Sequence, residues 1–159
     1  MQRFVQRPVR KPPKTRFMAA IATSLLLLAF GLLAAEQTPL ALKEAFKGSF
    51  LIGAALNPSE FTESDAGAAA LVKAQFDSIS PENVLKWASV HPAPDRYNFD
   101  PADEYVAFGE KNHMFIVGHT LVWQHQTPRW AFEDAKGNPV DRETLLKRMR
   151  EHIQTVVGR

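Results

Sequence analysis

The sequence predicts an α/β fold in which the strands of a parallel sheet alternate with helices. Apolar runs and amphipathic segments follow one another in the order strand–helix three times, and turn-forming proline, glycine and asparagine residues separate them. Three such units cannot close a barrel, and a parallel sheet of three strands leaves edges and one face poorly covered. The sequence therefore indicates a part of a larger α/β domain.

The first strand–helix unit follows a short linker and a helical segment over residues 40–46. Residues 50–56 form an apolar run that ends at Asn57-Pro58, which is the pattern of a buried strand. Residues 64–76 are rich in alanine and predict a helix. Its inner face is expected to contain Leu71, Val72 and Phe76.

The second unit begins with a strand over residues 77–80, which Pro81 stops. Asp100 is expected to cap the helix that follows, with Pro101 in its first turn. The face of this helix toward the sheet is expected to contain Ala102, Tyr105, Val106 and Gly109.

The third unit combines an apolar strand over residues 113–121 with a final helix that begins at Asp141. Apolar residues recur on one face of this helix at i, i+4, i+8 and i+11, which is the spacing of an amphipathic helix. The pattern is still in register near Val157, so we expect the chain to be the front part of a longer domain. The residues of this face are Leu145, Met149, Ile153 and Val156.

The net charge of the whole chain is +2, and it is positive only because the first 16 residues carry six basic and no acidic side chains. The remaining residues carry 13 basic and 17 acidic side chains, a net charge of −4. Nucleic-acid binding requires a basic patch on the folded domain, so the composition argues against that class of function. The chain has no cysteine, which excludes disulfides, thiolate metal sites and cysteine nucleophiles.

Residues 1–35 have the pattern of a signal peptide. A basic start is followed by the 19 uncharged residues 17–35, which end in two alanines. A cut after Ala35 would place Leu33 where a small residue is usual, and the apolar stretch is just long enough to span a bilayer. A cleaved signal and a retained N-terminal membrane anchor both stay open, with a buried core helix as a third alternative. Either of the first two places residues 36–159 in the periplasm or outside the cell.

Polar and aromatic residues gather in the loops that follow the second and third strands. Loops after the carboxyl ends of parallel strands are where βα domains carry their active sites. All three tryptophans lie in these loops, and an indole face beside amide and charged groups suits a sugar ring. The first of these loops contains Glu82, Asn83, Lys86 and Trp87, and the second contains His119, Trp123, Gln124, His125, Gln126 and Trp130.

These residues also have simpler explanations. Glu82 and Lys86 have the spacing of a surface ion pair, and a single tryptophan such as Trp87 is more often a core residue than a ligand platform. His119 and His125 lack a third ligand at a suitable spacing, so they do not predict a metal site. The sequence contains no phosphate-binding loop and no metalloprotease or serine-hydrolase motif, and we expect neither a metal nor a cofactor.

Two long motifs resemble segments of glycoside hydrolase family 10, the endo-1,4-β-xylanases. Residues 76–87, FDSISPENVLKW, are similar to the family segment FDxxTPENxMKW, and residues 118–130, GHTLVWQHQTPRW, are similar to GHTLVWHSQTPxW. Residues 97–103 and the final helix resemble the stretches that follow these motifs. The resemblance covers residues 41–159.

The resemblance implies a (β/α)8 TIM barrel, of which this chain supplies about the first three βα units. It also implies retaining hydrolysis of β-1,4-xylosidic bonds in xylan or xylo-oligosaccharides, with Trp87 and Trp130 in supporting positions. The family usually has His and Ser where this chain has Gln124 and His125, so this corner of the site is expected to differ. The residues that match substrate-binding positions are Glu82, Asn83, Lys86, His119, Trp123 and Gln126.

The resemblance places both catalytic glutamates, the acid/base and the nucleophile, on strands beyond Arg159. Retaining hydrolysis needs two carboxylates about 5–5.5 Å apart, and Glu82 has no partner carboxylate in the other two loops. Residues 36–159 are therefore expected to be the N-terminal part of a catalytic domain and to be inactive alone. The alternatives are a non-catalytic xylan-binding remnant and an unfolded fragment.

Overall fold

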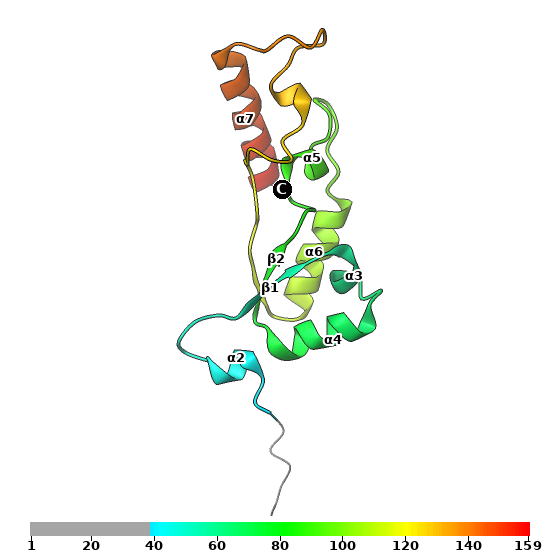
Figure 1. The fold of residues 1–159 in the computed structure, drawn as a ribbon, viewed down its shortest axis with the longest axis vertical. Helices are drawn as coiled ribbons and strands as arrows, with labels where there is room; N and C mark the ends of the chain where they lie inside the picture. Colours follow the sequence, from blue (N-terminus) through cyan, green and yellow to red (C-terminus); the bar gives the residue numbers. More distant parts are fainter. Residues whose placement is uncertain (1–38) are drawn as a thin grey trace, which may run out of the picture. The chain divides into compact units, whose positions relative to one another are not determined.

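A computed structural model of the chain describes residues 39–159 (Figure 1). The expected signal peptide or membrane anchor at residues 1–35 lies outside the described residues. Within the described part, no helix combines the length and the apolar character needed to cross a membrane. The features below belong to one compact unit, Leu40–Arg159.

The centre of this unit is a sheet of three parallel strands in the order β1-β2-β3. Ile79 of the middle strand lies opposite Ala54 on one side and Ile116 on the other. The parallel order follows from the helical connection after each strand, as the sequence predicted. The strands are β1 (Gly53–Leu56), β2 (Ser78–Pro81) and β3 (Phe115–Ile116).

Four of the helices correspond to those that the sequence predicted, namely α2, α4, α6 and α7. The one-turn helices α3 and α5 and a short 3-10 helix, η1, were not predicted. The N–H of Asn57 donates to the Glu60 carboxylate at 2.6 Å, and this bond closes the first turn of α3. The bounds are α2 (Leu42–Ala45), α3 (Pro58–Phe61), α4 (Ala66–Gln75), α5 (Trp87–Val90), α6 (Asp100–Lys111), η1 (Arg129–Ala131) and α7 (Arg142–Val157).

The core lies between the sheet and helices α3, α4 and α6, and Tyr105 of α6 is at its centre. The Tyr105 side chain is fully buried, and its ring packs edge-on against Phe61 at 5.9 Å between centroids. Its hydroxyl lies 2.8 Å from the Ile79 carbonyl and 3.1 Å from the Val117 carbonyl, and its single proton is shared between these two acceptors. Burial raises the pKa of Tyr105 to about 12, so the hydroxyl keeps its proton.

Strand β3 is shorter than the predicted strand at 113–121, and Pro81 explains why. The Val117 N–H still donates to the Ile79 carbonyl at 2.9 Å. In a parallel ladder the next bond would run from the N–H of residue 81 to the Val117 carbonyl. Proline has no N–H, so pairing stops there and the Tyr105 hydroxyl supplies the missing donor.

Three details of the predicted helix faces were wrong. Leu71 is 59% exposed, because successive helical residues point about 100° apart and Val72 takes the inner position. Asp100 is the first residue of α6 and not its cap; the helix begins after Phe99, which makes no side-chain capping bond. Phe108, which was not predicted, is buried in the α6 face, and the predicted Val106 is partly buried against the same core.

Helix α7 begins as predicted, with the Asp141 carboxylate accepting from the Thr144 N–H at 2.8 Å. The four predicted apolar residues of its inner face are only half-buried. The buried residue of this helix is His152, which lies seven residues after Leu145 on the same apolar face.

Gly109 lies where α6 packs closely against the sheet. A Cβ at this position would lie 2.5 Å from Ile116 Cγ1 and 2.9 Å from Ile79 Cδ1. We expect Gly109→Ala to lower the free energy of unfolding by about 1–3 kcal/mol, because added atoms in a packed core force side chains or backbone to shift.

Gly67 offers a matched control for this substitution. It lies in the first turn of α4, where the nearest atom to an added Cβ is an Asp65 oxygen at 3.5 Å. Gly67→Ala is expected to leave the free energy of unfolding unchanged or to raise it by up to about 1 kcal/mol, because alanine has a higher helix propensity than glycine. Urea denaturation of both variants measures the difference, and equal stabilities would show that α6 does not need glycine here.

Candidate functional site

The ends of β2 and β3 border an open cavity of about 410 Å³. Four of the side chains predicted to bind substrate line it, together with three residues from the ends of β1 and β2. Its lining residues are Ala55, Ser80, Pro81, Glu82, Asn83, Lys86 and His119. Loops far apart in the sequence therefore meet at the carboxyl edge of the sheet, where βα domains place their sites.

Asn83 connects the two loops. The Lys86 ammonium donates to Asn83 Oδ1 at 3.2 Å, and the Gln126 amide donates to the same oxygen at 3.2 Å. An ammonium group can only donate, so the atom of Asn83 that faces Lys86 is the oxygen. The Asn83 amide N–H groups are not engaged by these two bonds and can donate to a ligand.

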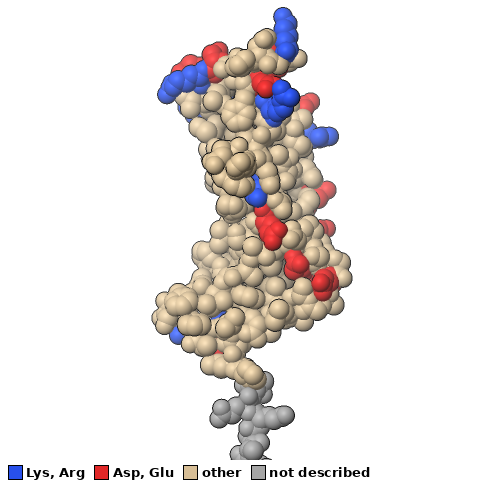
Figure 2. Space-filling view, in the orientation of Figure 1, with Lys and Arg blue, Asp and Glu red and all other residues tan. Residues whose placement is uncertain are grey.

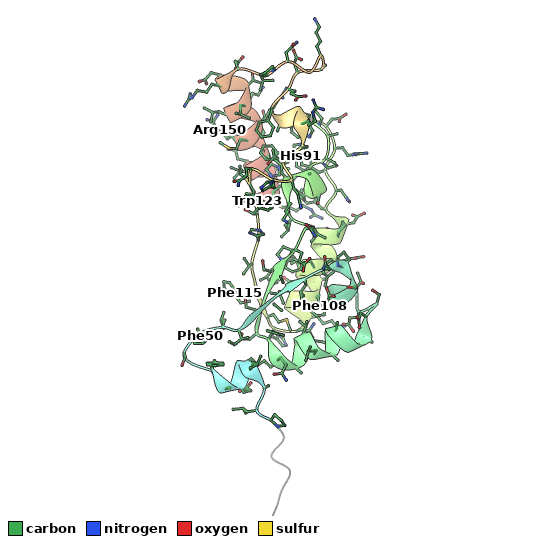
Figure 3. All side chains as sticks on the ribbon, in the orientation of Figure 1. Phe50, His91, Phe108, Phe115, Trp123 and Arg150 are labelled. Carbon is green, nitrogen blue, oxygen red and sulfur yellow. The ribbon has the colours of Figure 1, made fainter. Side chains whose placement is uncertain are left out.

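Lys86 also lies against Trp123. Its Nζ is 4.8 Å from the centroid of the Trp123 ring, within the range of a cation–π contact. The Trp123 side chain is 38% exposed, so part of its indole face remains open. In the view of Figure 3, Trp123 and His91 lie toward the end of the unit that carries α7, and Phe115 lies toward the opposite end.

The backbone holds Gln126 in place beside Asn83. Its carbonyl accepts from the Ala88 N–H at 2.9 Å, which joins the loop after β3 to helix α5. Gln126 has a positive φ of 59°, which is uncommon for a residue with a side chain. The Thr127 hydroxyl donates to the Trp123 carbonyl at 2.5 Å and closes the turn between these residues.

The remaining predicted residues lie around this group. Trp87 is 3% exposed and packs edge-on against the half-buried Trp130 at 6.0 Å, so Trp87 offers no open face like that of Trp123. Gln124 lines an apolar cavity between this loop and α7, and the exposed His125 ring contacts Trp123 edge-on at 4.9 Å. Among residues 39–159, no three His, Cys, Asp or Glu side chains are grouped to hold a metal.

Lys86 does not form the surface ion pair with Glu82 that its spacing allows. The described residues contain no contact of 4.0 Å or less between these charges, and Lys86 bonds Asn83 instead. The Glu82 side chain is exposed at the edge of the cavity. It is the one carboxylate among the residues that line this cavity.

Sequence reasoning missed a buried histidine pair beneath the loops. His91 Nδ1 lies 3.3 Å from His152 Nδ1, and His152 Nε2 lies 3.0 Å from the Leu121 carbonyl. Burial lowers the pKa of His152 to about 4 and also lowers the pKa of His91, so both rings are neutral at pH 7. The signal for His152 was present in the sequence, because it continues the apolar stripe of α7.

Charged side chains are unevenly spread around this unit. On the face that Figure 2 shows, acidic side chains lie along the side of α6 and basic ones concentrate at the end that carries α7. The site itself combines one cation, Lys86, with amide groups and an open indole ring. Such groups can hold the hydroxyls and the C–H faces of a sugar by hydrogen bonds and stacking.

Parallel βα units with polar and aromatic side chains at the carboxyl ends of their strands are typical of α/β-barrel enzymes, and these side chains suit a carbohydrate. The family model described as glycosyl hydrolase family 10 matches residues 41–159. The chain belongs to this family, and its three parallel strands form a part of the family's TIM barrel.

Similar proteins agree with this assignment. A β-1,4-xylanase of Dictyoglomus thermophilum is 44% identical over 117 residues, which is 74% of this chain and 30% of that protein. The crystal structure of an endo-1,4-β-xylanase from Caldicellulosiruptor owensensis is 42% identical with a TM-score of 0.67, covering 74% of this chain and 35% of that one. A mutant structure in complex with xylotriose is 38% identical with a TM-score of 0.68, covering 73% and 34%. The chain thus spans about a third of the length of these relatives.

Proposed function

We propose that this chain supplies the sugar-holding part of an endo-1,4-β-xylanase that cleaves xylan with retention. The observation that carries the proposal is the junction at Asn83, where Lys86, Gln126 and the open face of Trp123 converge at the carboxyl edge of the sheet. The names of the relatives and the xylotriose bound to one of them support xylan or xylo-oligosaccharides as the ligand.

Each residue of the site has a proposed role. Asn83 and Lys86 donate hydrogen bonds to sugars on the glycone side of the scissile bond, and Glu82 accepts them at the edge of the cavity. His119 bonds the sugar beside the scissile bond, and Trp123 forms a wall of that site. Gln126 makes a further contact with the sugars on the glycone side. Trp87 and Trp130 support the loops that carry these residues.

Catalysis is proposed to need carboxylates other than Glu82. Retaining hydrolysis requires an acid/base and a nucleophile about 5–5.5 Å apart, and Glu82 is alone among the residues lining the cavity. We therefore expect the 159-residue chain to bind xylo-oligosaccharides with little or no hydrolysis. Glutamate-dependent release of shorter sugars from xylan by the purified chain would contradict this expectation.

Export from the cytoplasm is a separate proposal that depends on residues 1–35 alone. Their basic start and uncharged stretch support a signal peptide or a membrane anchor. N-terminal sequencing of the protein isolated from cells would distinguish the two, because a cleaved signal removes the first residues and an anchor keeps them.

Lys86→Met tests the sugar site directly. The substitution keeps much of the aliphatic stem and removes the charge and the bond to Asn83. We expect the Kd for xylotriose, measured by isothermal titration calorimetry on the 159-residue chain, to rise about 10- to 100-fold, because hydrogen bonds from charged groups contribute about 1.5–3 kcal/mol.

Lys147→Met is the matched control, since Lys147 lies exposed on α7 and pairs only loosely with Glu151 at 3.8 Å. It should leave the Kd for xylotriose within about twofold of the wild-type value. Equal effects of the two substitutions, or no binding by the wild-type chain, would refute the proposed site.

A further inference from the structure

We propose that His152 is a positioning residue that holds the two sugar-binding loops in register, with His91 as its proton donor. This inference rests on the proposed function of those loops. The residue comes from α7 and does not reach the cavity, so it acts only through other residues.

His152 contacts both loops at once. Its ring is fully buried and stacks on Trp87 at 4.0 Å between centroids, with only 1° between the planes. Trp87 directly follows Lys86 in the chain. The Nε2 atom of the same ring lies 3.0 Å from the Leu121 carbonyl, two residues before Trp123. Lys86 and Trp123, which contact each other, are therefore one and two residues away along the chain from the residues that His152 contacts, Trp87 and Leu121.

The hydrogen-bond geometry assigns the proton positions on the pair. Three contacts require a proton: His152 Nε2 with the Leu121 carbonyl at 3.0 Å, Nδ1 with Nδ1 at 3.3 Å, and His91 Nε2 with the Pro94 carbonyl at 3.3 Å. Two neutral imidazoles carry two N–H groups. The shortest of the three contacts, to the Leu121 carbonyl at 3.0 Å, keeps one of them on His152 Nε2.

The second proton then belongs on His91 Nδ1. His152 Nδ1 is bare in this tautomer, and two bare nitrogens at 3.3 Å inside the protein would repel each other and stay unsatisfied. His91 Nδ1–H therefore donates to His152 Nδ1, and the bare His91 Nε2 faces the exposed Pro94, where solvent can reach. The hydrogen bond from His91 thus stabilises the tautomer of His152 that has a bare Nδ1 and an N–H at Nε2, which donates to the Leu121 carbonyl.

Burial of the two rings favours their neutral forms at neutral pH. The cavity beside His91 is lined by Lys147, Arg148 and Glu151 of α7 and by the Tyr97 ring. Arg148 is engaged by backbone carbonyls, including that of Glu133 at 3.0 Å. A first added proton on His91 Nε2 would satisfy the Pro94 carbonyl. A second, on His152, would set N–H against N–H and break the pair.

Two substitutions separate the ring from its hydrogen bond. His152→Phe keeps an aromatic ring against Trp87 and removes both nitrogens, whereas His152→Gln can place an amide N–H toward the Leu121 carbonyl. We expect His152→Phe to raise the Kd for xylotriose about three- to tenfold at pH 7 and His152→Gln to recover most of the affinity. Circular dichroism should show both variants folded.

A readout that does not depend on sugar binding keeps this inference distinct from the proposed function. In the 159-residue chain, ¹⁵N NMR should show His152 with its proton on Nε2 and His91 with its proton on Nδ1. Amide hydrogen exchange across residues 119–127 should be several-fold faster in His152→Phe than in the wild type. If the wild type fails to bind xylotriose but shows these tautomers and this exchange difference, the proposed function fails and the positioning role stands. A proton on His152 Nδ1, or unchanged exchange in His152→Phe, would overturn the positioning role.

Discussion

Tyr105→Ala is expected to lower the free energy of unfolding by about 3–5 kcal/mol, as for other large aromatic residues truncated in a core. The side chain is fully buried between α6 and the sheet and packs against Phe61. Its hydroxyl also donates to the Val117 carbonyl, which Pro81 leaves without a backbone donor. The substitution therefore removes a core side chain and a bond that ends the β2–β3 ladder.

Tyr105→Phe separates these two effects, because it removes only the hydroxyl. We expect Tyr105→Phe to lower the free energy of unfolding by about 1–3 kcal/mol, the usual cost of leaving one buried group, here the Val117 carbonyl, without a donor. Urea denaturation of the 159-residue chain, followed by far-ultraviolet circular dichroism, gives both values. A Tyr105→Phe variant as stable as the wild type would show that water or another donor replaces the hydroxyl.

Acidification is expected to destabilise the described unit between pH 6.5 and pH 4 through His152. Burial lowers the pKa of His152 from the ordinary value of 6.5 to about 4 in the folded chain. The unfolded chain therefore binds more protons in this window, and the free energy of unfolding falls as the pH falls. A pKa shift of this size lowers the free energy of unfolding by about 3 kcal/mol between pH 6.5 and pH 4. Below pH 4, His152 causes little further loss.

The control is His152→Phe, which cannot titrate at this position. The free energy of unfolding of this variant should vary much less between pH 6.5 and pH 4. A smaller dependence on pH remains, because the pKa of His91 is also lowered. Glu63, Asp134 and Asp141 have lowered pKa values because of the hydrogen bonds they accept, so their contribution is lost at lower pH, through their folded pKa values. Equal pH slopes in the wild type and the variant would contradict the role assigned to His152.

The order of strands and helices could be predicted because its signals are local. The apolar run before Pro58 located β1, and the short segment before Pro81 located β2, although Pro81 is itself the last residue of that strand. The Asp141 cap located the start of α7. The extent of β3 could not be predicted, because it depends on which residue of β2 lies opposite it. An apolar run over 113–121 does not show that its partner at position 81 lacks an N–H.

The candidate site was predictable in part, because the order of the strands fixes which loops lie at the same edge of the sheet. The rule that loops follow the carboxyl ends of parallel strands brought Asn83, Lys86 and His119 to one cavity, as the structure places them. The pairing of the two histidines was not predictable, because they are 61 residues apart in the sequence. Only the burial of His152 had a local signal, namely its place on the apolar stripe of α7. The openness of Trp123 and the burial of Trp87 likewise depend on α7 packing beneath the loops.

The short parallel sheet has a consequence for how the protein behaves in solution. Within residues 39–159, β1 and β3 each pair on one side only, and Phe115 of β3 is 60% exposed. Unpaired strand edges beside exposed apolar side chains are templates for strands of other molecules. We therefore expect these edges to favour self-association at high concentration. A further strand laid along either edge would suppress aggregation by occupying the same backbone groups.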